Sequence, residues 1–340
     1  MPSGESRFVI ACAGSRKTTS LVEEALKLNG ARVLITTYTN ENVDQLTSFF
    51  IDRVGSVPPH VTIQSWFSFL LQDGIRPYQL DVTQRDRVRT IDYVSEQPWS
   101  AKKSNFDAYF LTAGNDVYGD HAAEFAYEAD VRSGGKVVRR LEEMYTHLFI
   151  DEVQDMAGYD LDLIERLFES NLVVIAMGDP RQATFQTNKS TKNSKFKGAN
   201  IGEWVKMKEF PIEYRTDCYR CHQSICDFAD GLYPSWPKSK SIGVADTTHD
   251  GIQYVTRDKV AAYMETHQPT VLRYWNKTDT MGLEAHNIGS VKGRTFARVL
   301  IFPTQPMIKY LKSGTLAEGS RPKFYVAVTR ARHSVAFVMD

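Results

Sequence analysis

A short segment near the start of the sequence carries residues that could act on a phosphate group. ACAGSRKT, residues 11–18, follows the apolar run FVIACA and precedes a helical pattern. It has the spacing of the phosphate-binding loop G-x-x-x-x-G-K-[ST], with Ala11 and Arg16 at the two glycine positions. Backbone N–H groups of such a loop bind phosphate, Lys17 would reach the phosphates, and Thr18 would hold Mg²⁺. A plain strand–turn–helix is the alternative for this segment alone.

Two further segments place polar side chains at the ends of apolar strands. HLFIDEVQD, residues 147–155, supplies Asp151, which could bind a metal, and Glu152, which could orient or deprotonate a water molecule. A capped loop is the alternative for a lone Asp-Glu pair, and the upstream loop favours the catalytic interpretation. VVIAMGDPRQATF ends in Gln182, whose neutral amide could sense a γ-phosphate, although a simple turn also explains it.

The elements that must position these residues indicate an α/β fold. Apolar runs alternate with longer helical patterns: FVIACA, ARVLITTYT, HVTIQSW, HLFIDE, LVVIAMGD, TVLRYW, RVLIFPT and HSVAFVMD. Unbroken runs of this kind are typical of strands buried on both faces of a parallel sheet, with helices on each side. TSLVEEALKLNG, between the first two runs, completes a βαβ unit. Residues 80–145 read as a helical insertion, and a domain boundary is expected near residues 204–211.

The overall composition is that of an ordinary globular protein, and the distribution of charge along the chain is more informative. The 340 residues suffice for two domains, and 42% apolar with 24% charged residues is ordinary for a globular protein. The net charge is zero, but residues 291–340 hold nine Lys and Arg against two acids, a local charge of +7. Residues 187–200 add four lysines and no acid. This asymmetry is compatible with a bound polyanion, and ordinary solvated faces explain it equally well.

No secretory signal or apolar stretch of membrane-span length is found, and four cysteines suggest a reducing compartment. A cytoplasmic protein without membrane contact is therefore expected. CYRCH, residues 218–222, matches the haem-attachment string C-x-x-C-H. Haem and a cysteine-based metal cluster are rejected because there is no export signal and no second Cys pair. The cysteines are expected to pack a helix start, with His222 as a surface or capping residue.

In order along nearly the whole chain, these segments resemble the motifs of superfamily 1 DNA helicases of the UvrD, Rep and PcrA type. The matching segments are ACAGSRKTT, LITTYTNENVDQL, VTIQSWFSFLL, FIDEVQD, GDPRQ, CYRCHQSICDFAD, NIGSVKGRTFARVLIF and KFYVAVTRARHSVAFV. The resemblance implies two RecA-like P-loop NTPase domains with parallel sheets, at residues 1–205 with an insertion at about 80–145, and at residues 206–340. It also implies Mg²⁺-dependent hydrolysis of ATP, with other NTPs left open, coupled to domain closure and to movement on single-stranded DNA, with RNA left open.

The resemblance also implies roles for individual residues. Glu152 is the expected catalytic base, Gln182 couples the γ-phosphate to the nucleic acid, and Arg220 and Arg330 reach the γ-phosphate across a cleft between the domains. Thr18 and Asp151 are expected to hold the metal, and Tyr219 to stack on the base. The expected nucleotide contacts are Ala13, Gly14, Ser15, Arg16, Lys17, Thr18, Thr19, Tyr219 and Gly293.

The resemblance places the single strand on loops that follow the second and third strands. The expected nucleic-acid contacts are Thr37, Tyr38, Thr39, Asn40, Gln64, Ser65 and Trp66. Helix capping is the alternative for the polar residues, whereas for Trp66 core packing is the favoured interpretation. The lysines of residues 187–200 could add contacts to the phosphate backbone, or could simply be solvated.

Departures from the family pattern keep other functions open. Arg16 replaces a glycine, and its side chain is expected either to leave the loop, which is favoured, or to lie along the phosphates. The chain also lacks the large second-domain insertion of bigger family members. A second hypothesis is therefore a nucleotide- or nucleic-acid-sensing subunit that regulates a nuclease partner, as in Gabija-like phage-defence complexes. A third, an inactive P-loop scaffold, conflicts with the presence of Lys17, Asp151 and Glu152.

Overall fold

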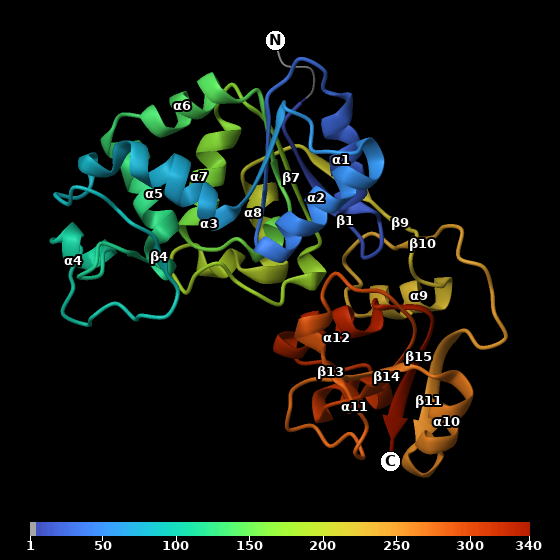
Figure 1. Cartoon of the computed structure of the whole chain (residues 1–340). Coiled ribbons are helices and arrows are strands. Elements are labelled where there is room, and N and C mark those ends of the chain that lie inside the picture. Colours follow the sequence, from blue (N-terminus) through green and yellow to red (C-terminus); the bar gives the residue numbers. More distant parts are fainter. Residues whose placement is uncertain (1–4) are drawn as a thin grey trace. The chain divides into compact units, whose positions relative to one another are not determined.

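The computed structural model describes residues 5–340, and Figure 1 shows its elements. The chain divides into two compact units. The first consists of Met1–Val9, Lys17–Gly178 and Phe185–Glu213, and the second of Ile10–Arg16, Asp179–Thr184 and Tyr214–Asp340. The second unit thus includes the loop after the first strand and the turn after residue 178. The domain boundary expected near residue 205 stays a prediction.

A six-stranded sheet has the order β3-β2-β6-β7-β1-β8. Its strands are β1 (Arg7–Ala11), β2 (Val33–Thr37), β3 (Val61–Ser65), β6 (His147–Ile150), β7 (Val173–Gly178) and β8 (Ile212–Arg215). The pairs β2–β3, β2–β6 and β6–β7 are parallel. Every residue of β2, β6 and β7 is buried, as the unbroken apolar runs predict. Because these strands run in one direction, the segments that follow them leave the sheet at the same edge.

The helices of the first unit join and flank this sheet. They are α1 (Lys17–Lys27), α2 (Asn40–Val54), α3 (Trp66–Phe69), α7 (Tyr159–Phe168) and α8 (Ile201–Met207). Much of the core is aromatic: the Phe8 ring stacks on Phe168 with centroids 4.7 Å apart and contacts Trp204 edge-on at 5.7 Å. This packing ties the first strand to the last helix of the unit.

The insertion is less helical than the sequence suggests. A π-helix (Leu70–Ile75) and a 3-10 helix (Arg76–Asp81) lead into it, and it comprises β4 (Ile91–Asp92), α4 (Phe106–Phe110), β5 (Val117–Tyr118), α5 (Ala122–Arg132) and α6 (Lys136–Met144). Apart from the two residues of β4, residues 82–105 form no helix or strand. Helices α5 and α6 contribute Phe125 and Leu141 to the same core cluster as the sheet, so the insertion packs as part of the first unit.

The second unit is built on a five-stranded sheet with the order β11-β15-β14-β12-β13. Its strands are β11 (Gly251–Thr256), β12 (Thr270–Arg273), β13 (His286–Asn287), β14 (Phe296–Phe302) and β15 (Ala331–Met339), and every pairing is parallel. The helices are α9 (Gln223–Gly231), α10 (Val260–His267), α11 (Gln305–Ser313) and α12 (Arg321–Val328), and β9 (Asp217–Cys218) pairs with β10 (Lys240–Ser241). The rings of Phe228, Phe324 and Phe337 lie within 5.8 Å of one another and join α9 and α12 to β15.

The predicted fold class, α/β with parallel sheets, is confirmed, and all eight apolar runs form strands. Strands β8 and β11 were missed because both are edge strands whose residues are only partly buried, so neither has an unbroken apolar run. Among the described helices, none combines the length and the apolar character needed to cross a membrane.

Candidate functional site

The loop after β1 has an unusual backbone. Gly14 and Arg16 both adopt positive φ, at 75° and 58°. A Cβ at residue 14 would lie 2.6 Å from the Cβ of Arg220, and the Tyr219 N–H donates to the Gly14 carbonyl at 2.9 Å. The glycine is therefore required both by its left-handed conformation and by the close approach of the chain at residues 219–220.

The residues of this loop fit a bound phosphate. The Ser15 hydroxyl is buried and has no hydrogen-bond partner among residues 5–340, so it is a polar group that a ligand could satisfy. Lys17 and Thr18 follow at once as the first two residues of α1, where N–H groups and the helix dipole favour an anion. Ala13 is buried and Thr19 is partly exposed in the first turn of α1. This loop fits the phosphates of an NTP, and the Thr18 hydroxyl suits Mg²⁺.

Arg16 does not occupy the loop with its side chain. It is exposed, and its guanidinium carbon lies 4.1 Å from the centroid of the Tyr219 ring. The side chain therefore leaves the loop, as the favoured interpretation of the sequence expects. One face of Tyr219 is covered by this contact, so a nucleotide base stacked on Tyr219 would have to use the other face.

The carboxylate pair of the first unit follows β6 directly. Asp151 is 4% exposed, and its Oδ1 accepts a hydrogen bond from the Glu152 N–H at 2.9 Å. Glu152 has φ of 56°, a left-handed conformation that is uncommon for a glutamate. The Gln154 amide donates to the Glu152 carboxylate. Strain of this kind gathers at functional sites, and the hydrogen bond from Gln154 holds the Glu152 carboxylate.

In the second unit, two of the predicted catalytic residues touch. The Arg330 side chain is 1% exposed, and its Nη2 donates to Gln182 Oε1 at 3.0 Å. The Gln182 amide donates in turn to Asp179 Oδ2 at 2.9 Å, which also accepts from the Tyr325 hydroxyl at 3.2 Å. Gln182 and Arg330, 148 residues apart in sequence, therefore belong to one buried polar network.

The end of α12 holds both predicted arginines. Arg220 Nη1 donates to the Thr329 carbonyl at 3.2 Å, and Arg330 Nη2 lies 3.4 Å from Thr329 Oγ1. Arg330 Nη1 also donates to the carbonyl of Arg294, in the loop that contains Gly293. Gly293 has φ of 86° with open space around it, so its conformation alone explains the glycine, and its nucleotide contact stays a prediction.

The sequence interpretation missed Arg181. This residue is 3% exposed and forms ion pairs with Asp179 at 2.8 Å and Asp230 at 3.4 Å, beneath the face of Tyr325. Burial lowers the pKa of Arg181, but the charge and hydrogen bond of Asp179 together with the charge of Tyr325 outweigh burial and raise the pKa overall, so the side chain stays protonated. The arginine in GDPRQ, directly after a buried strand and two residues from an acid, was the available signal.

The predicted nucleic-acid residues separate into two groups. Thr37 and Thr39 accept hydrogen bonds from Asn42, Gln64 donates to Asp73, and Ser65 caps α3. Tyr38 is partly exposed and its hydroxyl donates to the Gln186 carbonyl at 3.3 Å, while Asn40 is exposed at the start of α2. The expected nucleic-acid contact of Trp66 is wrong, and the favoured core-packing interpretation is confirmed: Trp66 is fully buried, and its indole N–H donates to Asp160 at 2.6 Å, so it cannot stack on a base.

A cavity of about 610 Å³ in the first unit lies beside Tyr38. Phe67 and Tyr93 also line it, with the Phe67 centroid 6.2 Å from Tyr38 and 5.1 Å from Tyr93. Tyr93 is 66% exposed. Neither Phe67 nor Tyr93 was singled out, because Phe67 lies one residue beyond the expected loop and Tyr93 lies in the insertion.

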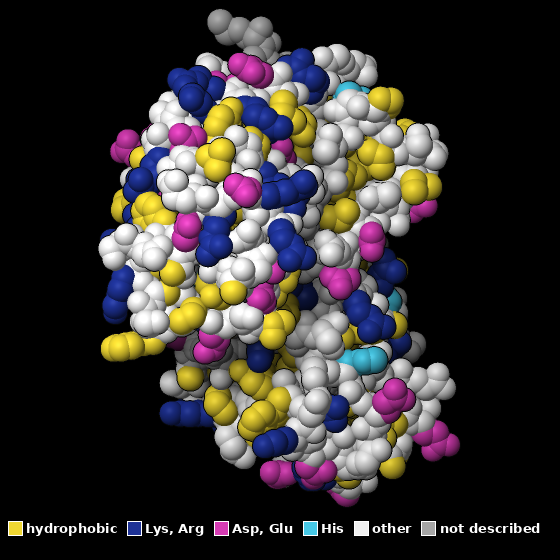
Figure 2. All heavy atoms as spheres, turned by 60° about the vertical axis from the view of Figure 1, so that its left-hand side comes forward, with side chains coloured by type: hydrophobic (Ala, Val, Ile, Leu, Met, Phe, Trp, Pro, Cys, Tyr) yellow, Lys and Arg dark blue, Asp and Glu magenta, His cyan; other side chains and the backbone are white. Residues whose placement is uncertain are grey.

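Two of the four lysines in residues 187–200 form ion pairs with acidic residues. Lys189 Nζ lies 3.6 Å from Asp120, and Lys192 Nζ lies 3.2 Å from Asp162. On the face shown in Figure 2, Lys and Arg side chains are interspersed with acidic and uncharged ones. The role of these lysines in binding a polyanion therefore stays a prediction.

Comparison with known proteins shows the family. Residues 131–339, more than half of the chain, match the family described as the viral superfamily 1 RNA helicase core domain. The chain belongs to this family. This agrees with the expected superfamily 1 helicase core, but it does not support the UvrD, Rep and PcrA type or a regulatory subunit of a nuclease complex. No curated protein sequence matches the chain.

Solved structures with the same fold include arterivirus nonstructural protein 10, a helicase. Its crystal structure is 16% identical, with 98% of this chain and 59% of that chain covered and a TM-score of 0.52. A complex of arterivirus nonstructural protein 10 with DNA is 16% identical, with 98% and 60% covered and a TM-score of 0.50. This likeness shows the fold, and the present chain spans about three fifths of the length of those proteins.

Proposed function

We propose that this chain is the NTP-hydrolysing core of a helicase that acts on single-stranded RNA. The observation that carries the proposal is the loop after β1, where Ser15 presents a buried hydroxyl without a partner among the described residues, between two left-handed residues and the start of α1. Such a loop is suited to bind phosphate through backbone N–H groups.

The chemistry follows from the side chains around the phosphates. Mg²⁺, held by Thr18 and Asp151, would neutralise charge on the phosphate oxygens. Glu152 accepts the proton of the attacking water, because its constrained backbone and the hydrogen bond from Gln154 hold its carboxylate in one direction. Arg220 and Arg330 bind the oxygens of the transferred phosphoryl group, for which a planar guanidinium is well suited.

The single strand is assigned to the aromatic cavity of the first unit. Tyr38, Phe67 and Tyr93 offer ring faces or edges on which bases could stack, and stacking contributes about 1–3 kcal/mol per base. Tyr38 follows β2 and Gln182 follows β7, and the γ-phosphate contact of Gln182 would report nucleotide state. RNA is chosen as the substrate because the matching family is one of RNA helicases, while the DNA complex of arterivirus nonstructural protein 10 makes DNA the alternative.

The test is a steady-state NTPase assay with Mg²⁺, alone and with a single-stranded RNA or DNA of equal length. We expect hydrolysis that RNA stimulates more than DNA does. Lys17→Ala should abolish hydrolysis because the phosphates lose their main cation, whereas Lys27→Ala, at the exposed end of the same helix, should leave it unchanged. Absence of hydrolysis in the wild type, or equal activity of both variants, would contradict the proposal.

A further inference from the structure

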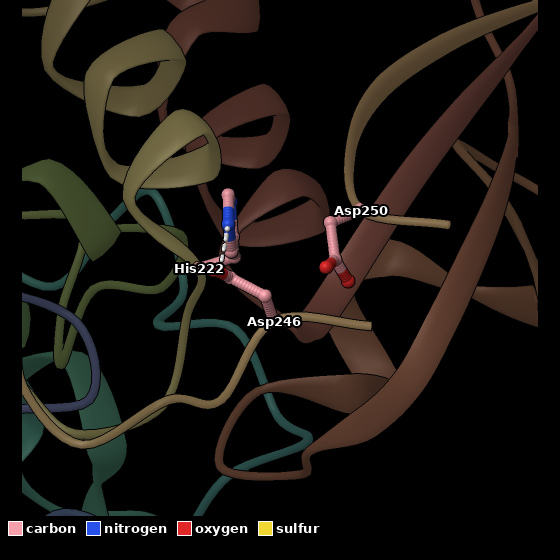
Figure 3. A group of neighbouring side chains, drawn as sticks. All are labelled: His222, Asp246 and Asp250. Atoms are coloured by element: carbon pink, nitrogen blue, oxygen red, sulfur yellow. Dashed lines mark hydrogen bonds and ion pairs between the residues drawn. The ribbon is translucent and has the colours of Figure 1, made fainter. Parts of the chain in front are cut away.

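Four side chains of the second unit that have no part in the proposed nucleotide chemistry gather where α9 begins. His222 caps α9, Asp246 and Asp250 belong to the loop that leads into β11, and His333 lies in β15. One ligand atom from each of His222, Asp246 and Asp250 lies within 4.8 Å of the others. Figure 3 shows these three side chains as neighbours. His333 Nδ1 lies 3.6 Å from Asp250 Oδ1. Elements far apart in sequence thus bring two imidazoles and two carboxylates together.

The spacing of these atoms suits a small cation. His222 Nε2 lies 3.1 Å from Asp246 Oδ1, and the His333–Asp250 separation is 3.6 Å. Two ligands on a tetrahedral Zn²⁺ with bonds of about 2.0–2.1 Å lie roughly 3.3 Å apart. The ligand atoms of His222, Asp246 and Asp250 lie within 4.8 Å of one another, and His333, 3.6 Å from Asp250, would join them around one ion after a movement of its side chain. Imidazole nitrogen and carboxylate oxygen are both common zinc ligands.

Hydrogen bonds from neighbouring hydroxyl groups hold the His222 ring and the Asp250 carboxylate in the orientations that metal ligands require. The other ring nitrogen of His222, Nδ1, lies 2.7 Å from the Ser224 hydroxyl, which leaves Nε2 facing Asp246. The Thr247 hydroxyl donates to Asp250 at 2.6 Å and accepts from Arg298 at 3.0 Å. Contacts of this kind fix the ring orientation and the carboxylate position in metal sites.

The charges of the cluster also call for a cation. No Lys or Arg within residues 5–340 forms an ion pair with Asp246 or Asp250, because Arg298 bonds to the Thr247 hydroxyl instead. His333 Nδ1 is buried without a hydrogen bond from any described residue. Asp246 is exposed to water and Asp250 is hydrogen-bonded to Thr247, so the buried His333 nitrogen is the group of this cluster that a further ligand would satisfy.

We propose that His222, Asp246, Asp250 and His333 bind one divalent transition-metal ion, with Zn²⁺ as the occupant. Four protein ligands and no open position describe a structural site rather than a catalytic one. The ion would fasten the 242–250 loop to α9 and β15. Since His222 stands two residues after Arg220, the ion would also stabilise the segment that carries Tyr219 and Arg220. This inference is independent of the proposed nucleotide chemistry.

The test is calorimetric titration of the full chain with Zn²⁺, after dialysis against a chelator and without nucleotide. We expect one equivalent to bind with micromolar or tighter affinity and to raise the thermal midpoint. Asp246→Asn removes an exposed ligand with little risk to folding and should weaken binding at least about tenfold. His333→Gln should do the same, while Asp258→Asn, an exposed aspartate of the same unit, is the matched control and should bind as the wild type does.

Two results would overturn the proposal. One is the absence of stoichiometric binding, or weak binding that Asp246→Asn and His333→Gln leave unchanged, which indicates an adventitious ion only. The other concerns the four buried free cysteines, which are the competing soft ligands. Titration with Co²⁺ separates the two sites, because thiolate ligands give intense charge-transfer absorption and nitrogen and oxygen ligands do not. Intense thiolate absorption at the first equivalent would assign the metal to the cysteines.

Discussion

The carboxylates after β6 and the arginines around the end of α12 are held in different ways. Asp151 Oδ1 accepts a hydrogen bond from the Glu152 N–H, and the Glu152 carboxylate accepts one from the Gln154 amide, so these two contacts are local, although the Asp151 N–H also donates to the Thr36 carbonyl of β2. Arg220 is held by a carbonyl 109 residues away, and Arg330 by a side chain 148 residues away. The acidic pair can therefore be recognised from a short stretch of sequence, whereas the arginines acquire their positions only through the fold.

The largest change in hydrolysis rate is expected for substitution of Arg330, which is held by contacts distant in sequence. With the proposed role of Arg330 at the γ-phosphate, Arg330→Ala should slow hydrolysis by about 10³-fold, the scale of an arginine finger, while nucleotide affinity changes far less. Single-turnover hydrolysis and nucleotide titration measure the two quantities. Arg332→Ala, an exposed arginine of the same strand, is the control. A parallel collapse of affinity and rate would make Arg330 a ground-state binder, and a lowered thermal midpoint would reveal a folding defect.

At the locally held pair, Glu152→Gln should slow turnover by roughly 10²-fold or more, because the amide cannot accept the proton of water. Nucleotide binding should stay intact, since Asp151 and the loop after β1 are unchanged. Turnover and nucleotide affinity are measured against Glu169→Gln, an exposed glutamate at the end of α7. Hydrolysis near the wild-type rate would remove Glu152 from the chemistry.

Substitution of two aromatic residues, Trp66 and Tyr38, should affect different properties of the protein. Trp66→Phe leaves Asp160 without its indole donor and should cost about 1–3 kcal/mol of unfolding free energy, with nucleic-acid affinity unchanged. Tyr38→Ala should weaken nucleic-acid binding instead. Denaturant unfolding and fluorescence anisotropy measure the two effects. If a stably folded Trp66→Phe variant bound nucleic acid more weakly than the wild type, Trp66 would have to be counted among the nucleic-acid contacts.

The loss of unfolding free energy in Trp66→Phe should also depend on pH. Burial raises the pKa of Asp160 to about 6 from 3.8, although hydrogen bonds from Thr187 and Trp66 oppose the rise. Because the folded-state pKa is the higher one, the contribution of Asp160 to stability falls as pH rises from about 4 to about 6. The indole bond favours the charged form, so the loss in Trp66→Phe should be greater at pH 8 than at pH 5. Equal losses at both pH values would contradict this.

The smallest effect is expected at Arg16. Its side chain stacks on Tyr219, outside the loop, and glycine adopts the required positive φ more readily. Arg16→Gly should therefore hydrolyse NTP at least as fast as the wild type, with affinity changed by no more than the few-fold that an exposed cation–π contact accounts for. Nucleotide titration and steady-state turnover measure this. A loss of tenfold or more in affinity would place the guanidinium on the phosphates.

Apolar runs predicted the strands buried on both faces, from β1 to β15, because burial on both faces leaves no polar alternation. The same logic fails for β8 and β11, whose partly exposed faces break the run. In the candidate site, the phosphate loop and the Asp151–Glu152 pair were accessible because their chemistry is compact in sequence. Trp66 was misassigned because its partner, Asp160, lies 94 residues away, and the buried Arg181 was missed although an aspartate precedes it by two residues.

The close packing of Gly14 against Arg220 has a mechanical consequence. The loop after β1 and the segment at residues 219–220, which follows β9, share a backbone hydrogen bond and leave no room for even a methyl group between them. A displacement of the loop on nucleotide binding must therefore carry Tyr219 and Arg220 with it, without an intervening lever or hinge. Gly14→Ala would place a methyl group 2.6 Å from the Cβ of Arg220 and should push the loop and residues 219–220 apart.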